Sequence, residues 1–279
     1  MAYESYECLR LRREAGVATV TIDHPPINLL DLPMIGELSR VGEELAADDD
    51  VRVVVLQSAD PEFFIAHADV RLIQTLPETP DTAPGQIGAF HAMVDRFRTM
   101  PKATIAKIAG RCRGGGSELV LSCDMRFAAL ETAILAQPEV SVGIIPGGSG
   151  TQRLPRLVGR GRALEIVLGG LDYRADLAER YGYVNRALPA ALLDDFVSAL
   201  ALRIASHPAQ AIALAKKAIL LADTGVEDGM RQEERLFYET ACSEPAKNLM
   251  AAYLAAGGQQ RDTEILLDGM GLLETGGDG

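Results

Sequence analysis

Two glutamates stand in glycine-rich or turn-forming surroundings, and they are the residues of this sequence best suited to acid–base chemistry. Glu118 directly follows Gly114-Gly-Gly-Ser117, and Glu139 lies 21 positions later in Gln137-Pro-Glu139. A glycine run brings bare backbone N–H groups close to a ligand, and a helix that begins there adds the positive end of its dipole. Such a site suits a reaction that forms an oxyanion and moves a proton.

Each motif on its own also has a purely structural explanation. The triple glycine fits a tight strand-to-helix turn, and Glu118 fits a carboxylate that faces a helix N-terminus. A nucleotide-binding loop is excluded, because GxxxxGK[ST] is absent and the glycine spacing does not fit GxGxxG.

The strings around both glutamates resemble the signature of the crotonase family, the enoyl-CoA hydratase/isomerase superfamily. The similarity includes Gly143-Ile-Ile-Pro-Gly-Gly-Ser-Gly-Thr-Gln-Arg-Leu154, in which a Pro-Gly turn precedes a helix start, and it covers roughly residues 5–255. It implies a crotonase-like α/β fold, a spiral of repeated ββα units followed by a helical module. It also implies an acyl-CoA substrate, with coenzyme A only as part of the thioester and with no metal or other cofactor.

The resemblance implies that Glu118 and Glu139 meet as the acid–base pair of an enoyl-CoA hydratase. Two carboxylates in an apolar pocket cannot both ionise easily, so one keeps a proton near neutral pH. One group would deprotonate water while the other protonates the α-carbon. A double-bond isomerase, or another thioester-enolate enzyme, is the alternative within the family. A non-catalytic CoA-binding or scaffold protein is the alternative outside it, and the presence of both glutamates counts against it.

The segment Phe63–Val70 resembles the family's Phe-x-Ala-Gly-Ala-Asp loop. By that match, the N–H groups of Ala68 and Gly115 form an oxyanion hole. His67 departs from the pattern, since glycine is usual there, and histidine would be strained if that position needed a positive φ. We expect its side chain to point away from the thioester and to take no part in proton transfer. The residues implied to contact coenzyme A or the acyl group are Pro26, Ala66, His67, Asp69, Ile73, Gly114, Pro138 and Gly147.

The C-terminal end also departs from the family, which often closes with a short basic and aromatic run that touches coenzyme A. Here the segment from Tyr253 to Arg261 replaces that run, and an acidic extension follows. Lys247 and Arg261 remain the candidates for contacts with phosphate.

Composition and charge exclude several other classes of protein. The 279 residues carry 27 basic and 39 acidic side chains, a net charge of −12, which disfavours a nucleic-acid partner. No apolar run approaches the length of a membrane span, and the polar, acidic N-terminus lacks the layout of a signal peptide. The four cysteines have no CxxC spacing, which argues against a zinc or redox site. We expect a cytoplasmic protein.

The pattern of apolar residues predicts alternating strands and helices to about Leu188, then helices only. We expect a core over residues 1–188, a helical module over 189–257, and a partly disordered acidic tail over 258–279, in a homotrimer or homohexamer as the resemblance implies. Predicted strands span Tyr6–Leu11, Val17–Ile22, Val51–Leu56, Thr104–Ile108, Met125–Ala128 and Ala133–Leu135. Predicted helices span Leu32–Ala47, Gly85–Met100, the triple glycine to Leu121, Thr151–Leu157, Gly161–Leu168, Ala190–Ser206, Ala209–Ala222, Val226–Tyr238 and Ser243–Ala256.

Overall fold

The computed structural model describes Tyr3, residues 6–75 and 87–223, and five further residues between 244 and 255. It divides the chain into two compact units, Met1–His207 and Pro208–Gly279. The helix predicted over Val226–Tyr238, most of Ser243–Ala256, the tail over 258–279, and the candidate phosphate contacts Lys247 and Arg261 lie outside the described residues.

The larger sheet of the first unit begins with an antiparallel hairpin of β1 (Leu9–Glu14) and β2 (Val17–Ile22). Ala15 and Gly16 join the strands with φ of 48° and 79°, as a two-residue hairpin turn requires. The remaining strands add in parallel, in the order β1-β2-β3-β5-β7-β10. They are β3 (Val53–Ser58), β5 (Ala103–Ile108), β7 (Met125–Ala129) and β10 (Arg186–Leu188).

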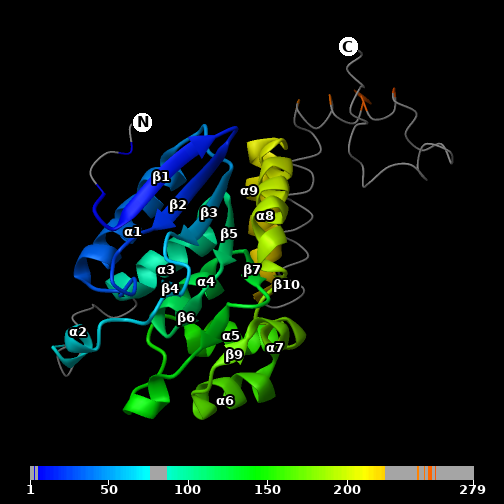
Figure 1. Ribbon diagram of the computed structural model, residues 1–279. Coiled ribbons are helices and arrows are strands. Elements are labelled where there is room, and N and C mark those ends of the chain that lie inside the picture. The colour runs from blue at the N-terminus through cyan, green and yellow to red at the C-terminus, as the bar shows by residue number, and fades with distance from the viewer. Residues whose placement is uncertain are drawn as a thin grey trace. The chain divides into compact units, whose positions relative to one another are not determined.

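A second, smaller sheet has the order β4-β6-β8-β9, and its strands are only two or three residues long. Each of its first three strands follows a strand of the larger sheet, so the chain repeats a strand–strand–helix unit. The predicted α/β crotonase-like spiral is confirmed by these repeats (Figure 1). The strands of this sheet are β4 (Phe63–Ile65), β6 (Arg111–Arg113), β8 (Ile134–Ala136) and β9 (Tyr173–Arg174).

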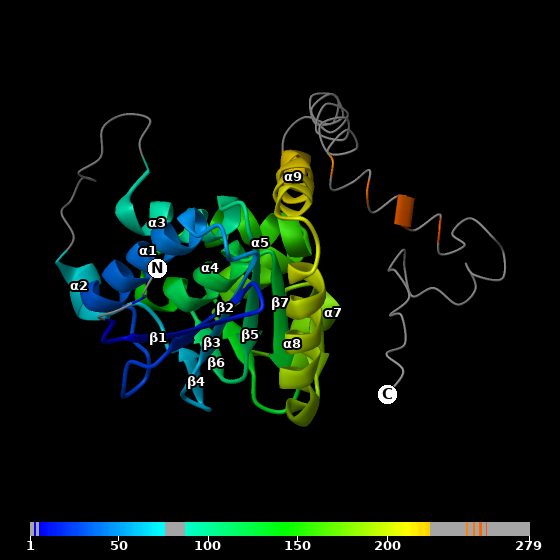
Figure 2. The same ribbon diagram turned by 90° about the horizontal axis from the view of Figure 1, so that it is seen from above.

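Helices cover both faces of the larger sheet. On one face, α1 (Leu32–Ala47) buries Met34, Leu38, Val41 and Leu45, and the Asp31 side chain caps its N-terminus by accepting from the Met34 N–H at 3.0 Å. α3 (Ala89–Thr99) packs against α1 and against α4 (Gly115–Ser122). On the other face, α8 (Ala190–Ala205) contacts β2, β3, β5 and β7 (Figure 2).

Five further helices and two 3₁₀ turns follow among the described residues. They are α2 (Val70–Gln74), α5 (Gly150–Val158), α6 (Arg160–Gly169), α7 (Ala175–Tyr181), α9 (Ala209–Leu220) and the 3₁₀ turns η1 (Glu139–Val142) and η2 (Leu221–Asp223). Within the described residues, none of the helices is both long and apolar enough to cross a bilayer.

Several predicted boundaries differ from the structure by a few residues. The first strand runs over Leu9–Glu14 instead of Tyr6–Leu11, because the tight Ala15-Gly16 turn fixes its register against Val17–Ile22. α8 belongs to the first compact unit, so the contacts divide the chain after His207, whereas the change of pattern along the sequence suggested Leu188.

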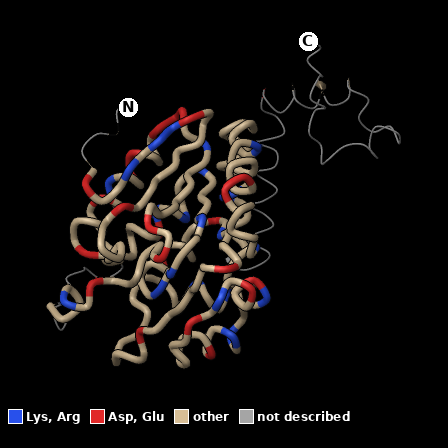
Figure 3. Tube along the Cα trace, in the orientation of Figure 1, with Lys and Arg blue, Asp and Glu red and all other residues tan. Residues whose placement is uncertain are grey.

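Lys and Arg are interspersed with Asp and Glu along the described trace (Figure 3).

Candidate active site

Glu118 lies on α4, a helix whose eight residues are all buried. The chain enters this helix from β6 through Gly114, whose φ of 52° is one that other residues rarely adopt. The glycines that follow also let the helix pack closely, because a Cβ atom at Gly116 would lie 2.6 Å from Cβ of Ile65. The triple glycine therefore has a steric role in addition to any role toward a ligand.

Two backbone N–H groups of one turn hold the carboxylate of Glu118. The N–H groups of Gly148 and Gly150 donate to Oε1 at 2.6 and 2.8 Å, and the side chain is only 2% exposed. Burial raises the pKa of Glu118 to about 7, the nearby charge of Glu139 adds to the rise, and the two N–H donors oppose it. Glu118 is thus both fixed in position and able to exchange a proton near neutral pH.

A side-chain network supports the turn that carries those two donors. Ser149, between the two glycines, has φ of 85°, a left-handed conformation that is costly for a residue with a side chain. Arg153 Nε donates to Ser149 Oγ at 2.6 Å, and its guanidinium also pairs with Asp95 Oδ1 at 2.8 Å. α3 and α5 therefore hold this strained turn from two sides.

Glu139 opens the 3₁₀ turn η1 and is 9% exposed. Gln137 Nε2 donates to its Oε1 at 3.0 Å, whereas Oε2 is buried and has no hydrogen-bond partner among the described residues. Gln137 Oε1 is likewise buried and unpaired. Burial raises the pKa of Glu139 above its ordinary value, and the hydrogen bond from Gln137 opposes the rise. Unpaired buried oxygens are costly, so this is where a polar ligand would gain most by binding.

The two glutamates belong to one site, as their shared neighbours show. A Cβ atom at Gly150 would lie 3.0 Å from Oε1 of Glu118 and 3.1 Å from Nε2 of Gln137, the amide that binds Glu139. The negative charge of Glu139 is also close enough to raise the pKa of Glu118. Residues 21 positions apart in the sequence thus lie near the same turn.

Ala68 and Gly115, the two predicted oxyanion donors, lie side by side, since a Cβ atom at Gly115 would be 3.5 Å from that of Ala68. Gly115 is the first residue of α4, where backbone N–H groups have no partner within the helix. The loop that carries Ala68 is anchored on residues 27–30. Ala66 N–H donates to Ile27, Leu30 N–H to His67, and Asp69 N–H to Leu30, at 3.2, 3.0 and 2.9 Å. None of these three bonds uses the Ala68 N–H.

His67 adopts no left-handed backbone conformation, so the strain foreseen for a histidine at this position does not arise. Its side chain is half-buried, and Nδ1 lies 2.8 Å from the carbonyl oxygen of Ala68. Its Cβ would lie 3.6 Å from a Cβ at Gly114, and Glu139 Oε1 would lie 3.3 Å from the same point. His67 and Gly114 therefore border the Glu139 side of the site.

The other predicted substrate contacts lie at varying depth. Ala66 is buried and Asp69 caps α2 by accepting from the Arg71 N–H at 2.9 Å. Pro138 is half-buried and caps η1, while Gly147 is exposed beside Gly148. Pro26 is exposed and Ile73 is half-buried in α2, and the contacts among the described residues tie neither of them to the two glutamates.

Several residues of the site were not singled out in the sequence. Gln137, Gly148 and Gly150 contact the carboxylates directly, and Phe90 packs against Gly148 and Gly115. The alternating glycines of Gly147-Gly-Ser-Gly150 were a usable signal, because such turns present backbone N–H groups to an anion. Phe90 carried no such signal, since an aromatic residue near a helix start is more often part of a core.

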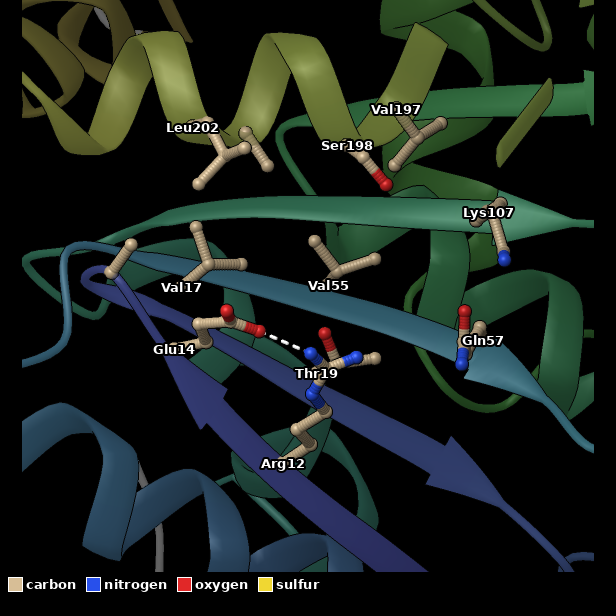
Figure 4. Close-up of a pocket in the computed structure, with 12 residues that line it drawn as sticks. Arg12, Glu14, Val17, Thr19, Val55, Gln57, Lys107, Val197, Ser198 and Leu202 are labelled. Carbon is tan, nitrogen blue, oxygen red and sulfur yellow. Dashed lines mark hydrogen bonds and ion pairs between the residues drawn. The ribbon is translucent and has the colours of Figure 1, made fainter. Parts of the chain in front are cut away.

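A hollow of about 470 Å³ opens elsewhere, between α8 and the strands of the larger sheet (Figure 4). The basic residues that line it are neutralised, since Arg12 pairs with Glu14 and Lys107 with Asp194. Val17, Val55 and Leu202 supply much of the remaining lining. Neither Glu118 nor Glu139 lines this hollow. Within the described residues, no group of three or more His, Cys, Asp or Glu side chains is arranged to hold a metal ion.

Comparisons with known proteins point to one family. A family model described as enoyl-CoA hydratase/isomerase matches residues 12–260. The "Probable enoyl-CoA hydratase" of Rhizobium meliloti is 35% identical over 254 residues, covering 90% of this chain and 96% of the relative. The short-chain-enoyl-CoA hydratase of Clostridium acetobutylicum is 33% identical, covering 88% and 93%. The crystal structure of an enoyl-CoA hydratase from Bacillus anthracis superposes with a TM-score of 0.82 at 29% identity, covering 89% and 96%.

Proposed function

Since this chain belongs to the enoyl-CoA hydratase/isomerase family, we propose that it is a hydro-lyase that adds water across the C2–C3 double bond of an enoyl-CoA thioester in fatty acid metabolism. The observation that carries the proposal is that Glu118 and Glu139 are both buried in one site and differ in their partners. Hydration needs two proton transfers, and the site offers two carboxylates with raised pKa values.

The thioester oxygen would accept hydrogen bonds from the N–H groups of Ala68 and Gly115. Attack at C3 moves electron density onto this oxygen, so donors placed in advance stabilise the enolate-like transition state. Each such donor is worth roughly 3–4 kcal/mol in barrier height. The dipole of α4 acts in the same direction.

The two carboxylates would divide the proton transfers. Glu118, held by Gly148 and Gly150, orients water and takes one of its protons while the water oxygen bonds to C3. Glu139 then gives its proton to C2 as the enolate collapses, so the product gains a C–O bond at C3 and a C–H bond at C2, while Glu118 keeps the proton taken from water and Glu139 is left ionised. The unpaired Oε2 of Glu139 supports this donor role, because it is free to reach a substrate atom.

Further proposals concern the substrate contacts, the cofactors, the oligomeric state and the location of the protein. We propose substrate contacts at Pro26, Ala66, His67, Asp69, Ile73, Gly114, Pro138 and Gly147, and coenzyme A only as part of the substrate, with no metal or other cofactor. A homotrimer or homohexamer, neither a nucleic-acid nor a membrane partner, and a cytoplasmic location complete the proposal. Among the described residues, Cys8, Cys112 and Cys123 are buried and form no disulfide, which fits a reducing compartment.

One observation favours an isomerase as the second candidate. Of the two glutamates, only Glu139 has a fully buried carboxylate oxygen without a partner among the described residues, and a double-bond shift needs a single group to move one proton between two carbons. In that case Glu118 would serve mainly to position the Gly148–Gly150 turn.

Loss of the conjugated thioester absorbance of a short 2-enoyl-CoA tests the proposal, with conversion of a 3-enoyl-CoA measured beside it. A hydratase consumes the first substrate and yields the 3-hydroxy product, whereas an isomerase interconverts the two without adding water. Absence of both reactions in a folded protein that still binds acyl-CoA would favour the non-catalytic alternative.

A further inference from the structure

Phe90, the second residue of α3, spans the two backbone segments that carry the site's N–H groups. A Cβ atom at Gly148 would lie 2.2 Å from Cε1 of its ring, and one at Gly115 would lie 3.2 Å from Cζ. The same point at Gly148 is 2.6 Å from Oε2 of Glu118, the oxygen that the turn does not bind. The ring therefore borders both the carboxylate and the helix start that faces Ala68.

The position of Phe90 on its helix explains why an aromatic ring reaches this point. Phe90, Met93, Val94 and Phe97 follow the i, i+3, i+4, i+7 spacing of one helix face. The last three are buried in the core, whereas Phe90 is half-buried. The apolar face of α3 thus continues past the core and ends over the active site.

We infer that Phe90 forms the wall that limits the acyl pocket, so that the protein prefers short acyl groups. The inference rests on the proposed function, in which the thioester lies over Ala68 and Gly115 with its C2–C3 bond between the glutamates. In that pose the ring flanks the reacting carbons, and an acyl chain that extends past them meets the ring. Leu30 limits the other side, since its Cδ1 would lie 3.0 Å from a Cβ at Gly115.

Removing the ring should convert a closed wall into space that a longer chain can fill. Each methylene that gains burial improves affinity about fourfold. Several methylenes would be newly accommodated, so the preference for a ten-carbon over a four-carbon acyl group should rise at least about thirtyfold in Phe90→Ala. A ring that serves only the core would instead lower stability and affect both chain lengths equally.

The experiment compares wild type, Phe90→Ala and Phe90→Leu, with Ile87→Ala as the matched control. Ile87 lies three residues earlier and is 59% exposed, so its truncation changes no pocket wall. Dissociation constants for butyryl-CoA and decanoyl-CoA are measured by calorimetry, which needs no turnover, and hydration of the matching 2-enoyl-CoA substrates is measured in parallel. The thermal midpoint of each variant reports folding, and Phe90→Leu supplies the comparison if the alanine variant does not fold.

We expect wild type and Ile87→Ala to bind butyryl-CoA in preference to decanoyl-CoA, and the Phe90 variants to lose or reverse that preference. A ratio that changes less than threefold in a folded Phe90 variant overturns the inference, as does a wild type that binds both chains equally. Preference without any hydration supports the pocket wall while refuting the hydratase. Absence of acyl-CoA binding in wild type refutes both.

Discussion

The surroundings of Glu118 and Glu139 bind a buried carboxylate in different ways. Around Glu118, the Gly148–Gly150 turn places two N–H groups on one oxygen, and the network of Ser149, Arg153 and Asp95 supports that turn. Around Glu139, the Gln137 amide binds one oxygen and the other has no partner among the described residues.

The difference shows how one pocket can assign two roles to the same residue type. Backbone donors are rigid and oppose the rise in the pKa of Glu118 that burial causes, so they suit a group that must hold its direction and accept a proton. An unpaired oxygen in a buried site favours the protonated form, which suits a group that donates its proton to carbon. Glutamate at both positions therefore does not imply equivalent functions.

The largest expected effect comes from removing either acid–base group. In the proposed hydratase, Glu118→Gln and Glu139→Gln should each lower hydration by roughly 10²–10⁴, because an amide can neither take nor give the required proton. Each change keeps the side-chain size, so thermal midpoints should show both proteins folded. Steady-state rates on a 2-enoyl-CoA and a 3-enoyl-CoA separate the candidates. Severe loss in Glu139→Gln with little loss in Glu118→Gln would indicate an isomerase.

The rigidity of the Glu118 region is tested at Gly148. In Gly148→Ala the new methyl group would meet the Phe90 ring at 2.2 Å and Glu118 Oε2 at 2.6 Å, so the carboxylate must shift. Misplacement of a catalytic group by about 1 Å costs on the order of 10²-fold in rate. Gly161→Ala, in α6, is the control, because nothing lies within 4 Å of the Cβ atom that it would add and the residue has no assigned place in the site. Equal kcat values for the two variants would show that the turn does not need to be rigid.

The raised pKa of Glu118 predicts how the free energy of unfolding depends on pH. The pKa of Glu118 rises from an ordinary 4.5 to about 7 on folding, so between these values the folded protein keeps a proton that the unfolded chain has lost. The free energy of unfolding should therefore fall as pH rises through this window. The contribution of Glu118 to that fall is about 3 kcal/mol.

Denaturant unfolding of wild type and Glu118→Gln at several pH values isolates this contribution, since glutamine does not titrate. Glu139 stays in both proteins and largely cancels in the difference. Glu179→Gln, at an exposed position, is the control and should leave the pH dependence unchanged. A stability difference between wild type and Glu118→Gln that is constant from acid to neutral pH would refute the raised pKa.

Parts of the fold and of the candidate site differ in how far the sequence alone predicts them. Long segments with clear periodicity, such as Leu32–Ala47 and Ala103–Ile108, were placed nearly to the residue. The smaller sheet was largely missed, because strands of two or three residues have too few positions to show alternation, and their pairing is set by tertiary contacts. Glu118 and Glu139 were found through their glycine and proline surroundings. Gln137 and Phe90 were not, since their roles depend on distances that only the folded chain defines.

The smallest expected effect concerns His67, which borders the Glu139 region without an assigned proton transfer. Its Nδ1 is engaged with the Ala68 carbonyl oxygen, so the side chain serves the loop that carries the Ala68 N–H. His67→Gly should therefore alter KM or stability and change kcat less than about tenfold, whereas loss of an acid–base group would cost roughly 10²–10⁴. His67→Asn, whose amide can replace the Nδ1 hydrogen bond, should restore most of any loss. The decisive measurement is kcat for both variants at about pH 5.5 to 8.5. A large drop in kcat that asparagine does not rescue, together with a changed pH profile, would make His67 a catalytic residue. It would also refute a mechanism in which the two glutamates alone carry out the proton transfers.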